Sequence, residues 1–313
     1  MTKNLSPSSS LPSHLSISLE IAGYEICAVP TGLFGLDGGA MFGTVPKALW
    51  SKSNPPDENN RISMEARALL LKSKNPNNPH KNILIDTGNG SDFVAKYGEK
   101  LGSKFSQMYA FDESGPNLLS SLKKHGVSSE QITDVILTHL HFDHAGGATR
   151  EWQGKIQATF PNAKYYIQKS NLETAQAPNK RERASYFAAN FQPLLENNQL
   201  HIVDGEKENL LPNISVVVSN GHTTGHQCVI VEDEKQRLVY CGDVIPTSSH
   251  VRSAWVMGYD LNPLQIMQEK AELLRLSQNK KTYYYFEHDP DCDMATVAVD
   301  RDDYKVQERF ILS

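Results

Sequence analysis

The sequence predicts an α/β protein in which two β-sheets pack together and helices cover their outer sides. Short apolar, strand-like segments occur in both halves of the 313-residue chain, and each set is followed by helical segments. No internal repeat and no shift in composition marks a domain boundary. We therefore expect a tail over residues 1–15 and a single domain over residues 16–313.

The first half of the chain contains a set of strands interrupted by one helix. The predicted elements are a strand pair at 15–30, strands at 66–72 and 82–85, a helix at 118–125 and a buried strand at 135–137. The strand pair turns at Ala22-Gly23, and the polar residues 75–79 provide a second turn. Gly126 is placed to end the helix.

The second half begins with a helical segment and returns to strands. The predicted elements are a helical segment at 170–198, strands at 200–203, 214–219, 227–231 and 238–241, a helix at 262–277 and a strand at 282–286. The charge run of residues 180–183 is predicted to be a solvated face. Tyr186, Phe187 and Phe191 have near-helical spacing, which favours a core role over contact with a ligand.

Composition narrows the class of protein. Hydrophobic residues make up 39% and charged residues 21% of the chain, as in ordinary globular domains, and the apolar runs are too short to span a bilayer. A net charge of −5 gives no electrostatic reason to expect nucleic acid as a partner. The Ser/Pro-rich N-terminus lacks the apolar core of a secretory signal, so we expect a disordered tail and a cytoplasmic protein. Free, mostly buried thiols are expected at the four separated cysteines, Cys27, Cys228, Cys241 and Cys292.

The most informative stretch of the chain lies directly after the strand at 135–137. It places His139, His141, Asp143 and His144 within six residues and ends at Gly146-Gly147. Alternate residues of a strand point the same way, and the turn that follows can bring the last two side chains to the same cavity. Imidazole and carboxylate are ligands that suit zinc, iron, cobalt and manganese. The stretch therefore predicts a metal site, with two ions as the favoured number.

Three further donor groups follow predicted strands later in the chain. His222 lies in a glycine-bounded turn, Asp243 follows the strand at 238–241, and His288 follows the strand at 282–286. Each signal is weak by itself, because a histidine or aspartate at a strand end is usually structural. Together with the first motif they predict one rim of a sheet that holds all the metal ligands.

The motifs His139-x-His141-x-Asp143-His144, His222 in Gly-His-Thr-x-Gly-His, Asp243 and His288 resemble the metallo-β-lactamase superfamily over nearly the whole chain after the tail. The resemblance implies a four-layer αβ/βα sandwich with a dinuclear centre at the sheet edges. His139, His141 and His222 would hold one ion, Asp143, His144 and His288 the other, and Asp243 would bridge them. His226 and Asp86 would lie behind the ligands and orient them. Zinc is the expected metal, while manganese, iron and cobalt are also compatible.

A narrower resemblance is to quorum-quenching N-acyl homoserine lactonases of this superfamily. The residues that carry it are Leu36 to Trp50 with its Asp-Gly-Gly-Ala-Met-Phe-Gly loop, Leu140 to Gly146, and Gly242 to Thr247 with His250. It implies ring opening by a hydroxide held between two metals, with Asp143 and Asp243 as catalytic residues and Asp243 as proton relay. Homodimers are expected by resemblance only.

One departure concerns substrate binding. Better-known lactonases of this kind carry a tyrosine three residues after the bridging aspartate, and this chain has Pro246 there. A metal, His250 or Tyr259 is expected to polarise the substrate carbonyl instead. Met41 and Phe42 are candidates for the wall that contacts the acyl chain, with a plain core role held equally open.

Other functions remain open from the sequence. The same bimetal centre could hydrolyse an aryl phosphotriester or ester, and a chain that kept the metals but lost catalysis would be a metal-binding or regulatory protein. The acidic balance argues against the nucleic-acid-processing branch. The di-iron flavoprotein branch is disfavoured because it tends to place Glu where this chain has His141, and no flavin-binding domain follows.

Overall fold

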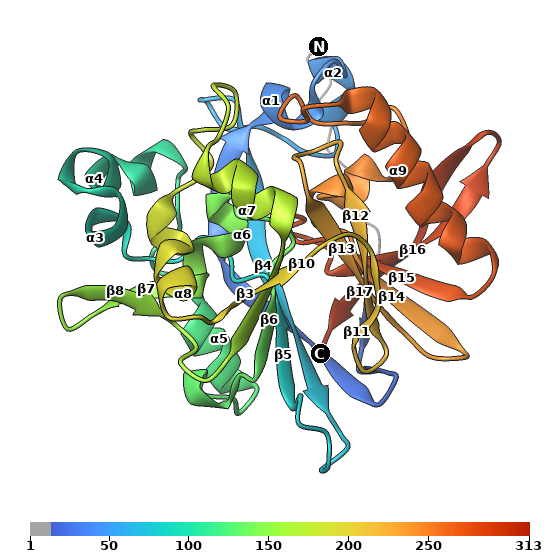
Figure 1. Cartoon of the computed structure of the whole chain (residues 1–313). Coiled ribbons are helices and arrows are strands. Elements are labelled where there is room, and N and C mark those ends of the chain that lie inside the picture. Colours follow the sequence, from blue (N-terminus) through green and yellow to red (C-terminus); the bar gives the residue numbers. More distant parts are fainter. Residues whose placement is uncertain (1–13) are drawn as a thin grey trace.

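The computed structural model describes residues 14–313, whose strands form two large sheets (Figure 1). The eight-stranded sheet has the order β1 (Leu15–Ile17), β17 (Asp303–Leu312), β16 (Met294–Asp300), β15 (Lys281–Tyr285), β14 (Gln236–Tyr240), β13 (His226–Glu232), β12 (Ile214–Ser219) and β11 (Lys207–Leu211). The seven-stranded sheet has the order β10 (Leu200–Val203), β9 (Lys164–Gln168), β6 (Asp134–Ile136), β5 (Asn82–Ile85), β4 (Arg61–Ser73), β3 (Tyr24–Asp37) and β2 (Leu19–Ile21). A separate hairpin consists of β7 (Thr149–Trp152) and β8 (Lys155–Ala158).

The inner faces of the two sheets meet in one apolar core. Leu71, Ile85 and Ile136 come from the seven-stranded sheet and Val229 and Tyr285 from the other, and all five are 0% exposed. The Tyr285 hydroxyl is satisfied by a 3.0 Å hydrogen bond to the Ala68 carbonyl, so its burial leaves no unpaired donor. This shared core fixes the ends of the strands of one sheet relative to those of the other.

Helices cover the outer face of each sheet (Figure 1). The seven-stranded sheet packs against α5 (Leu118–Lys124), α7 (Lys169–Gln176) and α8 (Gln192–Glu196), and the eight-stranded sheet packs against α9 (Pro263–Arg275). The four-layer α/β arrangement predicted from the sequence is therefore confirmed. The remaining α-helices are α1 (Gly38–Phe42), α2 (Lys47–Trp50), α3 (Phe93–Tyr97), α4 (Glu99–Met108) and α6 (Phe142–Ala145).

The prediction of a helical segment over residues 170–198 is correct only toward its two ends, where α7 and α8 lie. Pro178 follows α7, and proline both lacks an amide donor and disfavours helical backbone at the preceding residue. Residues 177–187 therefore cross the surface as a loop. Helices α3 and α4 and strands β7, β8, β9, β11, β16 and β17 were also not predicted from the sequence. The predicted tail over residues 1–15 falls mostly on residues 1–13, outside the described residues, and Leu15 already pairs with Phe310 in β1.

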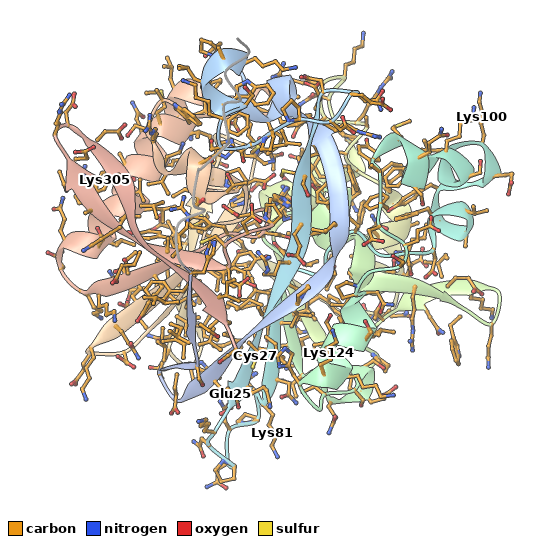
Figure 2. The ribbon with its side chains drawn as sticks, turned by 180° about the vertical axis from the view of Figure 1, so that it is seen from behind. Glu25, Cys27, Lys81, Lys100, Lys124 and Lys305 are labelled. Atoms are coloured by element: carbon orange, nitrogen blue, oxygen red, sulfur yellow. The ribbon has the colours of Figure 1, made fainter. Side chains whose placement is uncertain are left out.

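The lysines labelled in Figure 2 lie on the surface, whereas the cysteine thiols are buried. Figure 2 labels Lys81, Lys100, Lys124 and Lys305, which come from separate parts of the fold and are spread around the molecule. All four cysteines are free and buried, as predicted. Among residues 14–313, no helix combines the length and the apolar character that a membrane span requires.

Candidate metal centre

The seven predicted ligand side chains converge at one rim, between the two sheets. His139 and His141 follow β6, and Asp143 and His144 lie on the short helix α6 that comes next. His222 lies in the turn between β12 and β13, while Asp243 and His288 follow β14 and β15. The strands of both sheets end here, so residues more than a hundred positions apart meet. None of the seven is more than 8% exposed.

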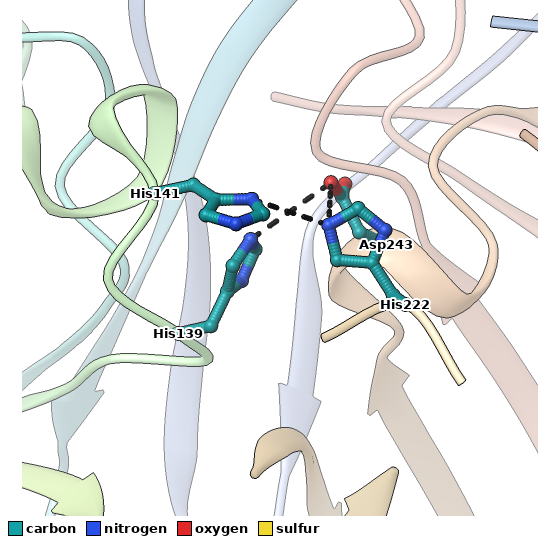
Figure 3. A group of neighbouring side chains, drawn as sticks. All are labelled: His139, His141, His222 and Asp243. Atoms are coloured by element: carbon teal, nitrogen blue, oxygen red, sulfur yellow. Dashed lines mark hydrogen bonds and ion pairs between the residues drawn. The ribbon is translucent and has the colours of Figure 1, made fainter. Parts of the chain in front are cut away.

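The first group consists of His139, His141, His222 and Asp243 (Figure 3). Asp243 Oδ2 lies 3.1 Å from His222 Nε2 and 3.9 Å from His139 Nε2. His141 Nδ1 lies 3.3 Å from His222 Nε2. One donor atom from each residue falls within 4.8 Å of all the others, which is compact enough for a single ion.

The second group consists of Asp143, His144 and His288 and lies on the other side of Asp243. The Nε2 atoms of His144 and His288 are 3.2 Å apart, and Asp143 Oδ2 lies 3.8 Å from His288 Nε2. Asp243 Oδ1 lies 3.2 Å from His288 Nε2 and 3.5 Å from His144 Nε2. Each carboxylate oxygen of Asp243 therefore faces a different group, which is the geometry of a bridging ligand.

The donor set fits divalent cations. Within residues 14–313, the buried His139 Nε2 has no hydrogen-bond partner, although an unpaired buried polar atom is costly. Imidazole nitrogens that face each other across 3.2 to 3.3 Å repel unless a proton or a cation lies between them. Nitrogen and carboxylate oxygen donors in two adjoining groups suit zinc, manganese, iron or cobalt.

Hydrogen bonds behind the histidines leave the donor atoms free. Asp260 Oδ1 lies 3.0 Å from His222 Nδ1, and the Glu65 carbonyl lies 2.8 Å from His288 Nδ1. With the proton on Nδ1, the Nε2 lone pair of each ring points into the centre. Sequence reasoning missed both partners. Nothing in the local sequence marks Asp260, which reaches His222 from the loop before α9.

Two carboxylates lie behind His144. Asp86 Oδ2 is 3.1 Å from His144 Nδ1, as the sequence predicted for an orienting residue, and Asp86 also accepts hydrogen bonds from the Thr138 amide and hydroxyl at 2.7 and 2.6 Å. Glu287 Oε2, which the sequence analysis did not single out, is 2.8 Å from the same nitrogen. Burial raises the pKa of Glu287 to about 8; His144 opposes this shift, while Asp86 adds to it.

His226 contacts the backbone of Asp243. Its Nε2 accepts a 3.1 Å hydrogen bond from the Asp243 amide, so it lies behind the centre. Gly242 makes this contact possible: it has φ +51°, and a Cβ there would lie 2.4 Å from His226 Nε2. Only glycine fits the turn that carries Asp243.

Charges inside the centre are strongly coupled. Burial works to raise the pKa of Asp243, but His144, His222 and His288 outweigh it and hold that pKa well below its usual range. Burial works to lower the pKa values of His222 and His288, but Asp243 outweighs it and raises them to about 10 and about 9. In the metal-free protein, imidazole protons therefore balance the buried carboxylate. Divalent cations would replace these protons.

A cavity of 320 Å³ opens onto the centre. Its lining includes His141, Asp143, His222, Asp243 and His288 from the centre, apolar residues Leu36, Met41, Phe142 and Met257, and the polar residues Tyr109, Arg181, Glu182, Ser185 and Tyr259. Met41 and Tyr259, two of the residues predicted to form a substrate pocket, line this cavity. The prediction of a solvated face at residues 180–183 is wrong for Glu182, which is 5% exposed and accepts a hydrogen bond from Thr223.

Two predicted pocket residues lie behind the cavity wall. Phe42 is 0% exposed and stacks on Trp50 and on His250. His250 is also 0% exposed, with its ring nitrogens bonded to the Thr247 hydroxyl at 2.7 Å and the Met41 carbonyl at 2.8 Å. Both side chains are therefore part of the core, which is the alternative held open for Phe42 and corrects the expectation that His250 contacts substrate. Their position supports Met41, whose side chain does line the cavity.

Comparison with known proteins agrees with this geometry. The chain is 31% identical over 164 residues to an N-acyl homoserine lactonase from Bacillus cereus. This match covers 50% of this chain and 56% of the relative, so the chain spans about half the length of that relative. A probable metal-dependent hydrolase from Staphylococcus aureus has a similar structure, with a TM-score of 0.79 and 29% identity over 94% of this chain and 100% of the other. AidC, a dizinc quorum-quenching lactonase, has the same fold, with a TM-score of 0.72 and 21% identity over 95% of this chain and 98% of its own.

The family model of the metallo-beta-lactamase superfamily matches residues 77–288. The matched region begins before β5 and includes all seven clustered side chains. Because it covers more than half of the chain, this protein belongs to the metallo-beta-lactamase superfamily.

Proposed function

We propose that this protein is a metal-dependent hydrolase that opens the ring of a lactone, with N-acyl homoserine lactones as the favoured substrates. The observation that carries the proposal is the placement of Asp243, whose two oxygens face two separate groups of metal donors. The names of the Bacillus cereus relative and of AidC, both lactonases, supply the substrate class.

Two bound divalent ions, proposed to be zinc, would supply a nucleophilic hydroxide at neutral pH and polarise the substrate carbonyl. The chain's own carboxylates then handle protons. Asp243, which lies between the two donor groups and on the cavity wall, is placed to take a proton from the nucleophile and pass it to the leaving alkoxide. Asp143 lines the same cavity and holds the second group in place.

Tyr259 is our candidate for the group that contacts the substrate carbonyl. Pro246 occupies the position where a tyrosine would be expected by resemblance, and proline has no side-chain donor. Tyr259 lines the cavity and is 40% exposed. A phenol on the cavity wall can donate to the oxyanion that develops during ring opening.

The shape of the cavity supports a small, partly apolar substrate. Leu36, Met41, Phe142 and Met257 offer an apolar surface for an acyl chain, while the metal donors lie on another part of the wall. Ligand pockets generally range from about 300 to 1,000 Å³. The 320 Å³ cavity is at the small end of this range, so we expect short acyl chains to be preferred over long ones.

Ring opening releases a proton and can be followed with a pH indicator. We expect zinc-loaded protein to hydrolyse N-acyl homoserine lactones, with lower KM for short acyl chains, and we expect the His222→Ala variant to be inactive because it loses a ligand of the first group. An aryl phosphotriester should be tested in parallel. Faster turnover of the phosphotriester would replace the lactone proposal, and two bound metals without turnover of lactone, ester or phosphotriester would point to a metal-binding role.

A further inference from the structure

The segment that carries His288 extends beyond the end of its own strand, where β4 of the other sheet bonds to it together with Pro246 and Asp293. After β15 ends at Tyr285, residues 286–289 run beside β4 of the seven-stranded sheet. The Arg67 amide donates to the Glu287 carbonyl at 3.1 Å, and the Glu65 amide donates to the His288 carbonyl at 3.3 Å. The His288 ring in turn reaches the Glu65 carbonyl. The position of His288 therefore depends on β4.

The Arg67 side chain clamps the same segment on both sides of His288. Its Nη1 donates to the Phe286 carbonyl at 3.2 Å and to the Asp289 carbonyl at 2.8 Å. The guanidinium is 3% exposed, so these bonds are protected from water. Arg67 holds both carbonyls with Nη1 while its Nε and Nη2 bond to other groups, which the single nitrogen of a lysine cannot do in the same geometry.

The charge of Arg67 is balanced by two carboxylates that do not belong to the metal donors. Its Nε lies 3.1 Å from Asp293 Oδ1, and its Nη2 bonds to Glu65 Oε2. Removal of the guanidinium would leave two buried carboxylates and two carbonyls without their partner. Residues 286–289 would then move toward water, because this movement solvates the unpartnered groups. The same movement would carry His288 away from Asp143 and His144.

We infer that Arg67 is a positioning residue for His288 and thereby decides whether the second metal group is occupied. The guanidinium makes no contact with a metal donor atom in the described structure; it acts through the carbonyls on either side of His288. His139, His141 and His222 are supported by other elements, so the first group should not depend on it. The inference rests on the metal centre proposed above, not on the proposed lactone substrate.

The test is a zinc titration of the whole protein by chelator competition, with metal content measured by mass spectrometry. We expect wild type to bind two zinc ions, and we expect Arg67→Met to bind the first as tightly and the second about 10- to 100-fold more weakly. Arg237→Met is the matched control, since Arg237 pairs with Glu232 and bonds to the Leu276 carbonyl away from the centre. This control should bind both ions like wild type.

Arg67→Lys keeps the positive charge without the fork and should show the same selective weakening to a smaller extent. It carries the test if Arg67→Met does not fold. Two ions bound with wild-type affinity, or parallel weakening of both ions in step with thermal stability, would overturn the inference. A wild-type chain that binds no zinc would contradict the proposed function as well, so the two failures can be told apart.

Discussion

Asp243 is the residue that contacts both groups of candidate metal donors. Its oxygens lie 3.1 Å from His222 and 3.2 Å from His288, its amide is held by His226, and Gly242 leaves room for that contact. An asparagine of the same shape would present only one oxygen and could not accept a proton at the other position. The bridging and the proposed proton relay would both suffer from this single change.

For Asp243→Asn we expect kcat to fall by about 10²- to 10⁴-fold while KM changes little, because general acid–base catalysis contributes about that much. Steady-state kinetics on a lactone should be measured on samples whose metal content is known. Asp302→Asn, an exposed aspartate, serves as control. Full turnover by Asp243→Asn with both metals bound would remove the relay from the mechanism.

Tyr259→Phe tests the proposed carbonyl contact. The loss of one oxyanion donor should lower kcat by about 10²-fold with little change in thermal stability, since Tyr259 is 40% exposed. Tyr109→Phe is the matched comparison because Tyr109 lines the same cavity. A larger loss of kcat in Tyr109→Phe than in Tyr259→Phe would show that Tyr109, not Tyr259, contacts the substrate carbonyl.

At the scale of elements, the turn after β14 that carries Asp243 requires glycine at position 242. Gly242 has φ +51° and Gly154, in the hairpin between β7 and β8, has φ +77°, so both occupy backbone that suits glycine. They differ in surroundings, because a Cβ at 242 would meet His226 at 2.4 Å whereas a Cβ at 154 would meet nothing within 4 Å.

Gly154→Ala should therefore cost only the backbone strain, about 1–2 kcal/mol, while Gly242→Ala should cost more and should also weaken metal binding. Urea unfolding and zinc titration of the two variants give the comparison. Equal losses of stability with unchanged zinc affinity in both would show that the contact between Gly242 and His226 does not position Asp243.

At the scale of the whole molecule, the centre lies where the two sheets meet, and the charges of its histidines depend on pH. The folded pKa values of His222 and His288, about 10 and about 9, are above the ordinary value near 6.5. A group with a raised folded pKa contributes stability below its unfolded pKa, and this contribution is lost as pH rises through the folded value. The metal-free protein should therefore lose this contribution between pH 6.5 and about 10.

Metal binding requires neutral imidazole, so the same rise in pH favours the metal-loaded form. We expect the difference in Tm between metal-loaded and metal-free protein to widen from pH 6.5 to pH 9 in thermal unfolding experiments. Other buried groups, including Lys96 and Lys270, are common to both forms and cancel in this difference. A difference that is constant or narrows over this range would contradict the proton-for-metal exchange.

The fold and the seven clustered side chains could be predicted from the sequence because the patterns that indicate them are local. Apolar strands with periodic patterns predict sheets, and donors placed directly after those strands predict a common rim. Asp260 and Arg67 could not be predicted in this way, because each acts on a histidine more than 30 positions away through a contact that only the tertiary fold creates. His250 has a donor ring and lies near Asp243 in sequence, but its neighbours Phe42 and Thr247 bury it.

Asp243 is proposed to join two metal sites. The most direct test is a crystal structure of zinc-loaded protein, with anomalous diffraction recorded at the zinc absorption edge. We predict two anomalous peaks about 3.5–4 Å apart, one beside His139, His141 and His222 and the other beside Asp143, His144 and His288, with Asp243 between them. A single anomalous peak, or zinc bound away from Asp243, would show that Asp243 does not bridge two metal ions.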